Sequence, residues 1–285
     1  MQSATLEGVI NVSGPLANAF SQLQPDTICD AKQLMSERRT NKKLRDDFFW
    51  TNNSSLYDLE NEIGVRDIKN GEAVVYFGKG NLIFDDIERA TQQLINTGNY
   101  RPANEKAESF KKAGTTLRVK LSELNLQGND NQWRYFEINT KNYDSLNSTQ
   151  RTFAERVYGE GEEFKLNMEM LSKSGKSNTR IYVLTPDYVK SNATESAIAR
   201  ACWLGSFDGV SRFLADGRVG GGPGVALRGV RLKNAEGAQK FEESPVDYES
   251  VFEQARLKPL EAVEYLNEQR ARGLLNIVHL LVRGL

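Results

Sequence analysis

The sequence predicts an α+β fold in which helical segments flank a β-rich middle region. Apolar residues recur with a helical period up to about residue 104, with a period of two between about 105 and 235, and again with a helical period beyond 235. We therefore expect an N-terminal arm and helical region (1–104), a β-rich domain (105–235) and a C-terminal helical segment (236–285). With 39% hydrophobic and 26% charged residues, the chain has enough apolar material for one large core or two modest ones.

The first region begins with residues 1–26, in which Gly, Pro, Ser and Asn mix with short apolar pieces. This composition predicts a loose arm or an edge strand. Residues 26–62 have a helical pattern, and 72–77 (EAVVYF) read as a buried strand followed by a turn at 78–81. A helix is expected from Asp85 and Asp86, whose carboxylates suit a helix start, to a stop at Gly98.

A basic group, Arg38 to Arg45, precedes the aromatic run Phe48 to Trp50. One interpretation is a contact patch for RNA or DNA, and the other is a solvated helix face that ends in a hydrophobic anchor. Acidic residues soon offset the positive charge, so the second interpretation is favoured.

In the β-rich region, a short charged helix is expected within 99–114, and the alternating segments 116–121 and 133–138 predict an antiparallel ribbon. Residues 144–158 form an amphipathic pattern that predicts a helix ending at Gly159.

The second half of this region is predicted as a strand over 180–189, broken at Pro186, and a short helix or turn over 195–204. Residues 205–224 are Gly-rich and expected to be irregular, and 226–232 (ALRGVRL) read as a strand. Beyond them, the apolar residues between 251 and 282 predict helices that pack on the body or on another copy of the chain.

Composition excludes several kinds of chemistry. The 37 Lys and Arg nearly equal the 38 Asp and Glu, so the chain lacks the basic surplus of a dedicated nucleic-acid binder. Two cysteines and one histidine are too few for a structural zinc site, and that histidine, His279, lies in an apolar run typical of a core. We expect no enzyme activity, no catalytic residues, no cofactor and no metal site.

Three motifs with a possible role in chemistry have simpler explanations. Ser174–Ser177 resembles the end of a phosphate loop, but Met170 occupies the position of a required glycine, so a polar turn is favoured. Glu160–Glu163 lacks the oxygen-ligand spacing of a calcium loop, and Asp85–Glu88 is explained by helix-start electrostatics.

No secretory signal is recognisable, because residues 1–20 carry Glu7 and have no basic stretch ahead of an apolar one. No stretch has the length of a membrane span. We expect a cytoplasmic protein, with export by a route without a cleaved signal as the alternative.

The window 205–225 (GSFDGVSRFLADGRVGGGPGV) departs from ordinary surface loops in what it omits. It contains no Lys, Glu, Gln, Met or Trp. All its residue types belong to the set obtained by randomising the first two bases of codons that end in cytosine. The window lies between Arg200–Trp203 and Ala226–Arg231.

This arrangement resembles the variable region of proteins diversified by retroelements, which is usually carried on a C-type-lectin-like fold. That family has the pattern Arg-Gly-Gly-Ser-Trp, two later arginines and Gly-Phe-Arg. Arg200–Trp203 would match the first element, Arg212 and Arg218 the arginines, and Arg228–Arg231 the last. Ala-Cys replaces Gly-Gly-Ser here, Val230 replaces the aromatic residue, and the match covers only about 180–232.

The resemblance implies a C-type-lectin-like domain whose rigid scaffold presents the window to a macromolecular target, with a protein as the favoured kind. The scaffold positions would include Arg200, Trp203, Arg218, Arg228 and Arg231. The expected ligand-binding residues are Gly205, Ser206, Asp208, Gly209, Val210, Arg212, Leu214, Asp216, Val219, Gly220, Gly221, Pro223 and Val225.

Other interpretations stay open. The window can be an ordinary Gly-rich connection, or, less favoured, a phosphate-binding loop at 220–224. The alternative function is a structural self-assembling protein such as a coat, shell or linker subunit, in which the terminal helices would mediate homo-oligomerisation.

Overall fold

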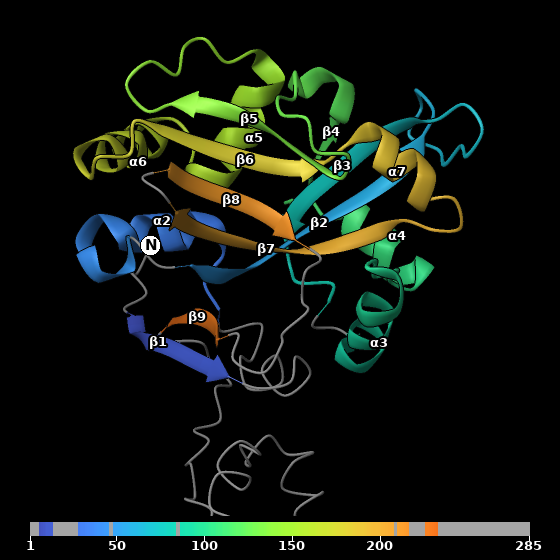
Figure 1. Cartoon of the computed structure of the whole chain (residues 1–285), viewed down its shortest axis with the longest axis horizontal. Coiled ribbons are helices and arrows are strands. Elements are labelled where there is room, and N and C mark those ends of the chain that lie inside the picture. The colour runs from blue at the N-terminus through green and yellow to red at the C-terminus, as the bar shows by residue number, and fades with distance from the viewer. Residues whose placement is uncertain are drawn as a thin grey trace, which may run out of the picture.

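A computed structural model describes residues 6–13, 28–45, 48–83, 86–207, 210–216 and 226–232 (Figure 1). The strands are β1 Leu6–Ser13, β2 Phe49–Glu60, β3 Glu72–Lys79, β4 Leu117–Lys120, β5 Trp133–Asn139, β6 Asn178–Leu184, β7 Ile198–Phe207, β8 Val210–Asp216 and β9 Ala226–Leu232. The helices are α2 Ala31–Thr40, α3 Ile87–Thr97, α4 Asn104–Lys112, α5 Ser148–Tyr158, α6 Glu162–Lys173 and α7 Pro186–Asn192, with short 3₁₀ helices η2 Lys42–Leu44 and η4 Leu121–Leu124.

Within the described residues, nine strands form one mixed sheet. Its main path runs β1-β9-β2-β7-β8-β6-β5, and β3 joins β2 to β4 at the side. Most neighbours are antiparallel, whereas β6 runs parallel to β8 and β2 parallel to β9. Strands on either side of the boundary expected near residue 104 therefore belong to the same sheet, since β3 pairs with β4 and β2 pairs with β7.

Helices α2, α5 and α6 cover one face of the sheet, which we call the core face. Phe77 of β3 lies at the centre of this core, with its ring 5.4 Å from that of Phe153 in α5 and 5.3 Å from that of Phe213 in β8, both edge to face. All three side chains are fully buried. Aromatic pairs in this geometry stabilise the core beyond their burial alone.

Helices α3 and α4 cover only part of the opposite face. Leu56 of β2 and Ala199 of β7 form a second cluster with Leu94 of α3 and Phe110 of α4. Neither helix extends over β8, β6 and β5, which run side by side in Figure 1. This division leaves the part of the face formed by β8, β6 and β5 without a helical cover from the described chain.

Local signals for helix ends are confirmed. The Asp86 carboxylate accepts a hydrogen bond from the Arg89 amide at the start of α3, and Gly98 ends it with a φ of 68°, a conformation that favours glycine. A capping box of Asn147 and Gln150 starts α5. The strands expected at 72–77, 116–121, 133–138 and 226–232 are present as β3, β4, β5 and β9.

Two predicted helical segments are strands instead. The helix expected over 26–62 ends at Thr40, and β2 follows. Of the short helix or turn expected at 195–204, residues 198–204 belong to β7. Both strands lie inside the sheet with nearly every residue buried, so neither shows a period of two. In β2, buried polar side chains bond to neighbouring strands: the Thr51 hydroxyl donates to the Cys202 carbonyl and the Asn53 amide to the Gly78 carbonyl.

The expected ribbon of 116–121 with 133–138 is also wrong. β4 pairs with β3, and β5 pairs with β6, because η4 turns the chain away between them. The strand expected over 180–189 ends at Leu184. Thr185 caps α7 and Pro186 occupies its first turn, where the missing amide proton is not needed.

β1 is an edge strand that pairs with β9. This agrees with the edge strand that was one of the two alternatives for residues 1–26. The C-terminal helices expected in 236–285 lie outside the described residues.

Candidate binding face

The unusual window begins in a hairpin rather than in an irregular loop. Gly205 to Phe207 complete β7, and Val210 to Asp216 form β8. β8 is held on both sides, antiparallel to β7 and parallel to β6. The expectation that 205–224 is irregular is therefore wrong for these two stretches, because neighbouring strands pair with their backbone.

The residues of β8 alternate between the two faces of the sheet. Ser211 and Phe213 point to the core face and are fully buried. Val210, Arg212 and Leu214 lie on the opposite face and are partly exposed. Alternation of this kind is a property of every strand, so only every second residue of β8 is available to a partner.

Register places side chains from three other strands beside the outward residues of β8. Leu214 is paired with Trp203 of β7 and Tyr182 of β6, and Arg212 with Gly205 and Arg180. Tyr135 and Glu137 of β5 pair with Tyr182 and Arg180. We call this partly exposed surface the open sheet face; it comprises Phe48, Tyr135, Glu137, Arg180, Tyr182, Trp203, Val210, Arg212 and Leu214.

Contacts among the β5 and β6 side chains fix their positions. The rings of Tyr135 and Tyr182 are 5.0 Å apart, and the Arg180 guanidinium lies 4.5 Å above the Tyr135 ring. Arg180 Nε also donates to Glu137 at 2.7 Å, and this hydrogen bond raises the pKa of Arg180 above its ordinary value. These side chains are held in place before any partner binds, which lowers the entropy lost on binding.

An aromatic pair borders the face on the β7 side. The Phe48 and Trp203 rings meet edge to face at 4.7 Å between centroids. The Phe48 ring lies over Gly205, where a Cβ atom would be only 1.6 Å from Phe48 Cδ1. Gly205 is thus required by packing, and it offers no surface of its own.

The predicted ligand-binding residues are distributed as follows. Val210, Arg212 and Leu214 come together on the open sheet face, whereas Ser206 is buried on the core side, where its hydroxyl donates to the Arg45 carbonyl at 3.0 Å. Asp216 is the last residue of β8, opposite Ala201. Asp208, Gly209, Val219, Gly220, Gly221, Pro223 and Val225 lie outside the described residues.

Among the positions expected to be scaffold, Arg200 is fully buried. Its guanidinium donates to the Asn99 side chain at 2.5 Å and to the Ala199 carbonyl at 3.1 Å, and it lies 5.9 Å from the centre of the Trp133 ring. These contacts join β7 to the segment before α4 and to β5. Trp203, by contrast, is partly exposed on the open sheet face.

Arg38 and Arg45 of the basic group near residue 40 bond inside the fold, whereas Lys42 and Lys43 are exposed. Arg38 is fully buried and donates to the Leu204 carbonyl, and Arg45 donates to the Arg38 and Arg39 carbonyls at the end of α2. Phe49 lies in the core. These contacts favour the helix with a hydrophobic anchor over a nucleic-acid patch.

The described part of the chain also bears on metal binding, on two of the polar motifs and on membrane spans. No three His, Cys, Asp or Glu residues there gather in a group that could hold a metal ion. Ser174–Ser177 form a polar turn between α6 and β6, and Glu163 pairs with Lys32 and Arg39. None of the described helices is long and apolar enough to cross a membrane.

Phe48, Tyr135 and Tyr182 were not predicted as site residues. The alternation of β5 (WRYFEI) and β6 indicates that some of these side chains face outward, but only the register β5-β6-β8-β7 shows that they adjoin the window. A sequence signal for Phe48 is absent, since its position depends on Gly205, 157 positions later in the chain.

Neither a family model nor a curated protein matches the chain. A solved structure does match it, described under the heading "Accommodation of massive sequence variation in Nanoarchaeota by the C-type lectin fold". The TM-score is 0.54, with 12% sequence identity over 81% of this chain and 99% of that one. This similarity confirms the C-type-lectin-like fold that the window and its flanking residues led us to expect.

Proposed function

We propose that this chain is a non-enzymatic binding protein that recognises a protein partner through its open sheet face. The observation that carries the proposal is the position of Val210, Arg212 and Leu214. Three residues of the unusual window lie on one strand and face outward beside fixed aromatic and arginine side chains.

The residue types of the open sheet face favour a protein as the partner. Trp, Tyr and Arg are the residues that most often dominate the binding energy of protein interfaces. Trp203, Tyr135 and Tyr182 supply large rigid contact areas, and Arg180 and Arg212 supply donors for polar groups of the partner. The single carboxylate, Glu137, is already bonded to Arg180 and to the Asn178 amide.

We further propose that the window 205–225 is diversified by a retroelement. The fold supports this proposal because the outward positions of β8 can change side chain without disturbing the core, whereas Ser211 and Phe213 cannot. Sequencing of the encoding locus tests it: a nearby near-repeat of these codons that differs at adenines, beside a reverse transcriptase, is expected. A locus without the repeat would refute the diversification and leave the binding role to be tested separately.

The binding role is tested with the immobilised full chain, a lysate of the source cells and identification of retained proteins by mass spectrometry. We expect that Arg212→Ala and Leu214→Ala each weaken the binding of a retained purified partner about tenfold or more. Arg156→Ala, which removes a partly exposed arginine of α5, is the matched control and should leave the affinity unchanged. Equal binding by all three variants would refute the role of the open sheet face.

Self-assembly is a second candidate, favoured by the loop between β2 and β3. Ile63, Val65 and Ile68 are 83%, 56% and 53% exposed, an unusual concentration of large apolar side chains in a short loop. Light scattering separates the two functions: a large regular assembly that is lost in Ile63→Ser favours self-assembly, and a small discrete particle favours the binding protein.

A further inference from the structure

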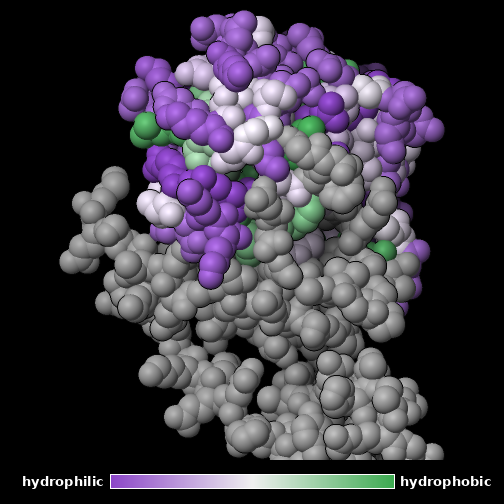
Figure 2. Space-filling view, turned by 60° about the vertical axis from the view of Figure 1, so that its left-hand side comes forward, coloured by the Kyte–Doolittle hydropathy of each residue, from purple (hydrophilic) through white to green (hydrophobic). Residues whose placement is uncertain are grey.

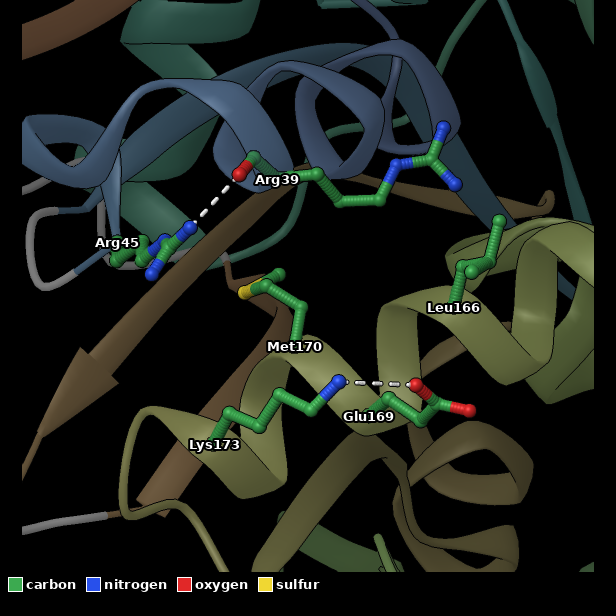
Figure 3. A pocket seen from close by; sticks show the side chains of 6 residues that line it. All are labelled: Arg39, Arg45, Leu166, Glu169, Met170 and Lys173. Carbon is green, nitrogen blue, oxygen red and sulfur yellow. Dashed lines mark hydrogen bonds and ion pairs between the residues drawn. The ribbon is translucent and has the colours of Figure 1, made fainter.

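On the core-face side of the sheet, a shallow pocket of about 240 Å³ lies between α6 and the end of α2 (Figure 3). It is lined by Arg39, Arg45, Leu166, Glu169, Met170 and Lys173. Both helices pack against the core face, so the pocket is on the other side of the sheet from the open sheet face. An inference about it is therefore independent of the proposed function.

The charge of the pocket is unbalanced. Three cationic side chains line it, against the single carboxylate of Glu169. A ligand with negative charge is attracted to such a site.

Two of the three cations are able to bind a further carboxylate. Lys173 pairs with Glu169 at 3.2 Å, but their side chains are 78% and 59% exposed, and exposed pairs of this kind are weak. Arg39 Nη2 donates to the Ser36 hydroxyl at 2.9 Å and lies 3.7 Å from Glu163, and the other guanidinium nitrogens provide donors for a second acceptor. Arg45, in contrast, is fixed by hydrogen bonds of 2.7 Å that it donates to the Arg38 and Arg39 carbonyls, and its side chain forms one wall of the pocket.

The pocket also has an apolar part. Met170 is buried except for 7% of its surface and projects into the pocket in Figure 3, and the neighbouring Leu166 is 44% exposed. In the space-filling view most of the described surface is hydrophilic, with hydrophobic residues scattered in it (Figure 2). A flexible methionine beside an exposed leucine provides an adaptable contact for an aliphatic side chain.

We infer that this pocket binds an acidic peptide segment, with an aliphatic side chain on Met170 and Leu166 and a neighbouring carboxylate on the cationic lining that includes Arg39 and Lys173. The volume is below that of pockets for drug-sized ligands and suits one or two side chains. A run of nucleic-acid phosphates fits less well, because the pocket has room for only one or two side chains and the whole chain has a net charge of −1.

Methyl NMR of the full chain labelled at methionine tests the inference, with Met170 assigned by Met170→Leu. The probe is acetyl-Leu-Asp-amide. Acetyl-Leu-Asn-amide has the same shape without the charge, and acetyl-Gly-Asp-amide lacks the aliphatic side chain. We expect the Met170 signal to shift with a Kd of about 1 mM for the first probe and severalfold weaker binding of the other two.

Substitutions locate the charges that bind. Arg39→Gln and Lys173→Gln should each weaken binding about two- to fivefold, the range expected for one exposed ion pair. Lys42→Gln, at the same end of α2 but not in the pocket lining, is the matched control and should have no effect. Equal effects of all three would show a diffuse attraction and overturn the inference.

Three further outcomes would also overturn it. Two of them are the absence of a Met170 shift at about 10 mM probe and equal binding of the Leu-Asp and Leu-Asn probes. The other is a Met170 shift with single-stranded octathymidylate at lower concentration than with the peptide, which would assign the pocket to nucleic acid.

Discussion

Replacing Gly205 with alanine removes the space in which the Phe48 ring lies. The new methyl group would be 1.6 Å from Phe48 Cδ1 and 2.2 Å from Cε1, far inside van der Waals contact, so the ring must move. The three atoms nearest to the new Cβ all belong to Phe48. The effect of the substitution should therefore depend on whether residue 48 carries a ring.

The magnitude follows from what the displaced ring loses. Phe48 is partly exposed, so leaving its site forfeits part of the burial energy of a phenylalanine, about 1–2 kcal/mol. Its edge-to-face contact with Trp203 contributes about 0.5–1.5 kcal/mol more. We expect Gly205→Ala to lower the free energy of unfolding by about 2–3 kcal/mol.

The sign should reverse when the ring is absent. In the Phe48→Ala background, Gly205→Ala should be neutral or stabilising by about 0.5 kcal/mol, because alanine in a strand loses less backbone entropy on folding than glycine does. Urea unfolding of the four proteins, followed by tryptophan fluorescence, measures this double-mutant cycle. Equal destabilisation by Gly205→Ala in both backgrounds would refute the packing explanation and assign the glycine to backbone conformation.

Two other predictions concern buried ionisable groups. Lys111 Nζ lies 2.7 Å from Asp58 and 3.2 Å from Glu60, both buried. Because Arg66 still pairs with Asp58 and Arg118 with Glu60, Lys111→Met should lower the free energy of unfolding by about 2 kcal/mol. Lys120→Met, which removes only an exposed pair with Glu72, should change the urea midpoint far less. Similar midpoints for the two variants would contradict the assignment. Burial also raises the pKa of two tyrosines and a thiol to about 12, namely Tyr76, Tyr158 and Cys202. The folded state holds these protons more tightly than the unfolded state, so the protonated groups contribute to the free energy of unfolding. This contribution is complete below the unfolded pKa values, about 8.5 for Cys and 10 for Tyr, and it is lost as the pH rises toward 12. The urea midpoint should therefore fall between pH 8 and pH 11, and an unchanged midpoint would be the contrary result.

Local features of the fold were predictable from the sequence. Asp86 and Gly98 marked the ends of α3 because capping and left-handed backbone depend on neighbouring residues only. β3 and β5 were predictable from their β-branched and aromatic residues. β2 was not, because its run of Asn and Ser is polar and buried, and only hydrogen bonds to other strands make that burial possible.

The candidate site was predictable in part, for a similar reason. The omission of five residue types pointed to the window, and three of its outward residues lie on the open sheet face. The inward position of Ser206 and the strand structure of β8 were missed, because both depend on pairing with β6 and β7. Tyr135 and Tyr182 are far from the window in sequence, so register alone could identify them.

The position of β8 between two partner strands has a consequence for the proposed binding role. A strand hydrogen-bonded on both sides keeps its backbone when an outward side chain is replaced, and its alternate residues stay about 7 Å apart. New outward side chains can then contact a new partner while the Cα positions that carry them stay unchanged. Unlike a flexible loop, such a surface does not lose chain entropy each time it binds, so each substitution acts on affinity through its own contacts.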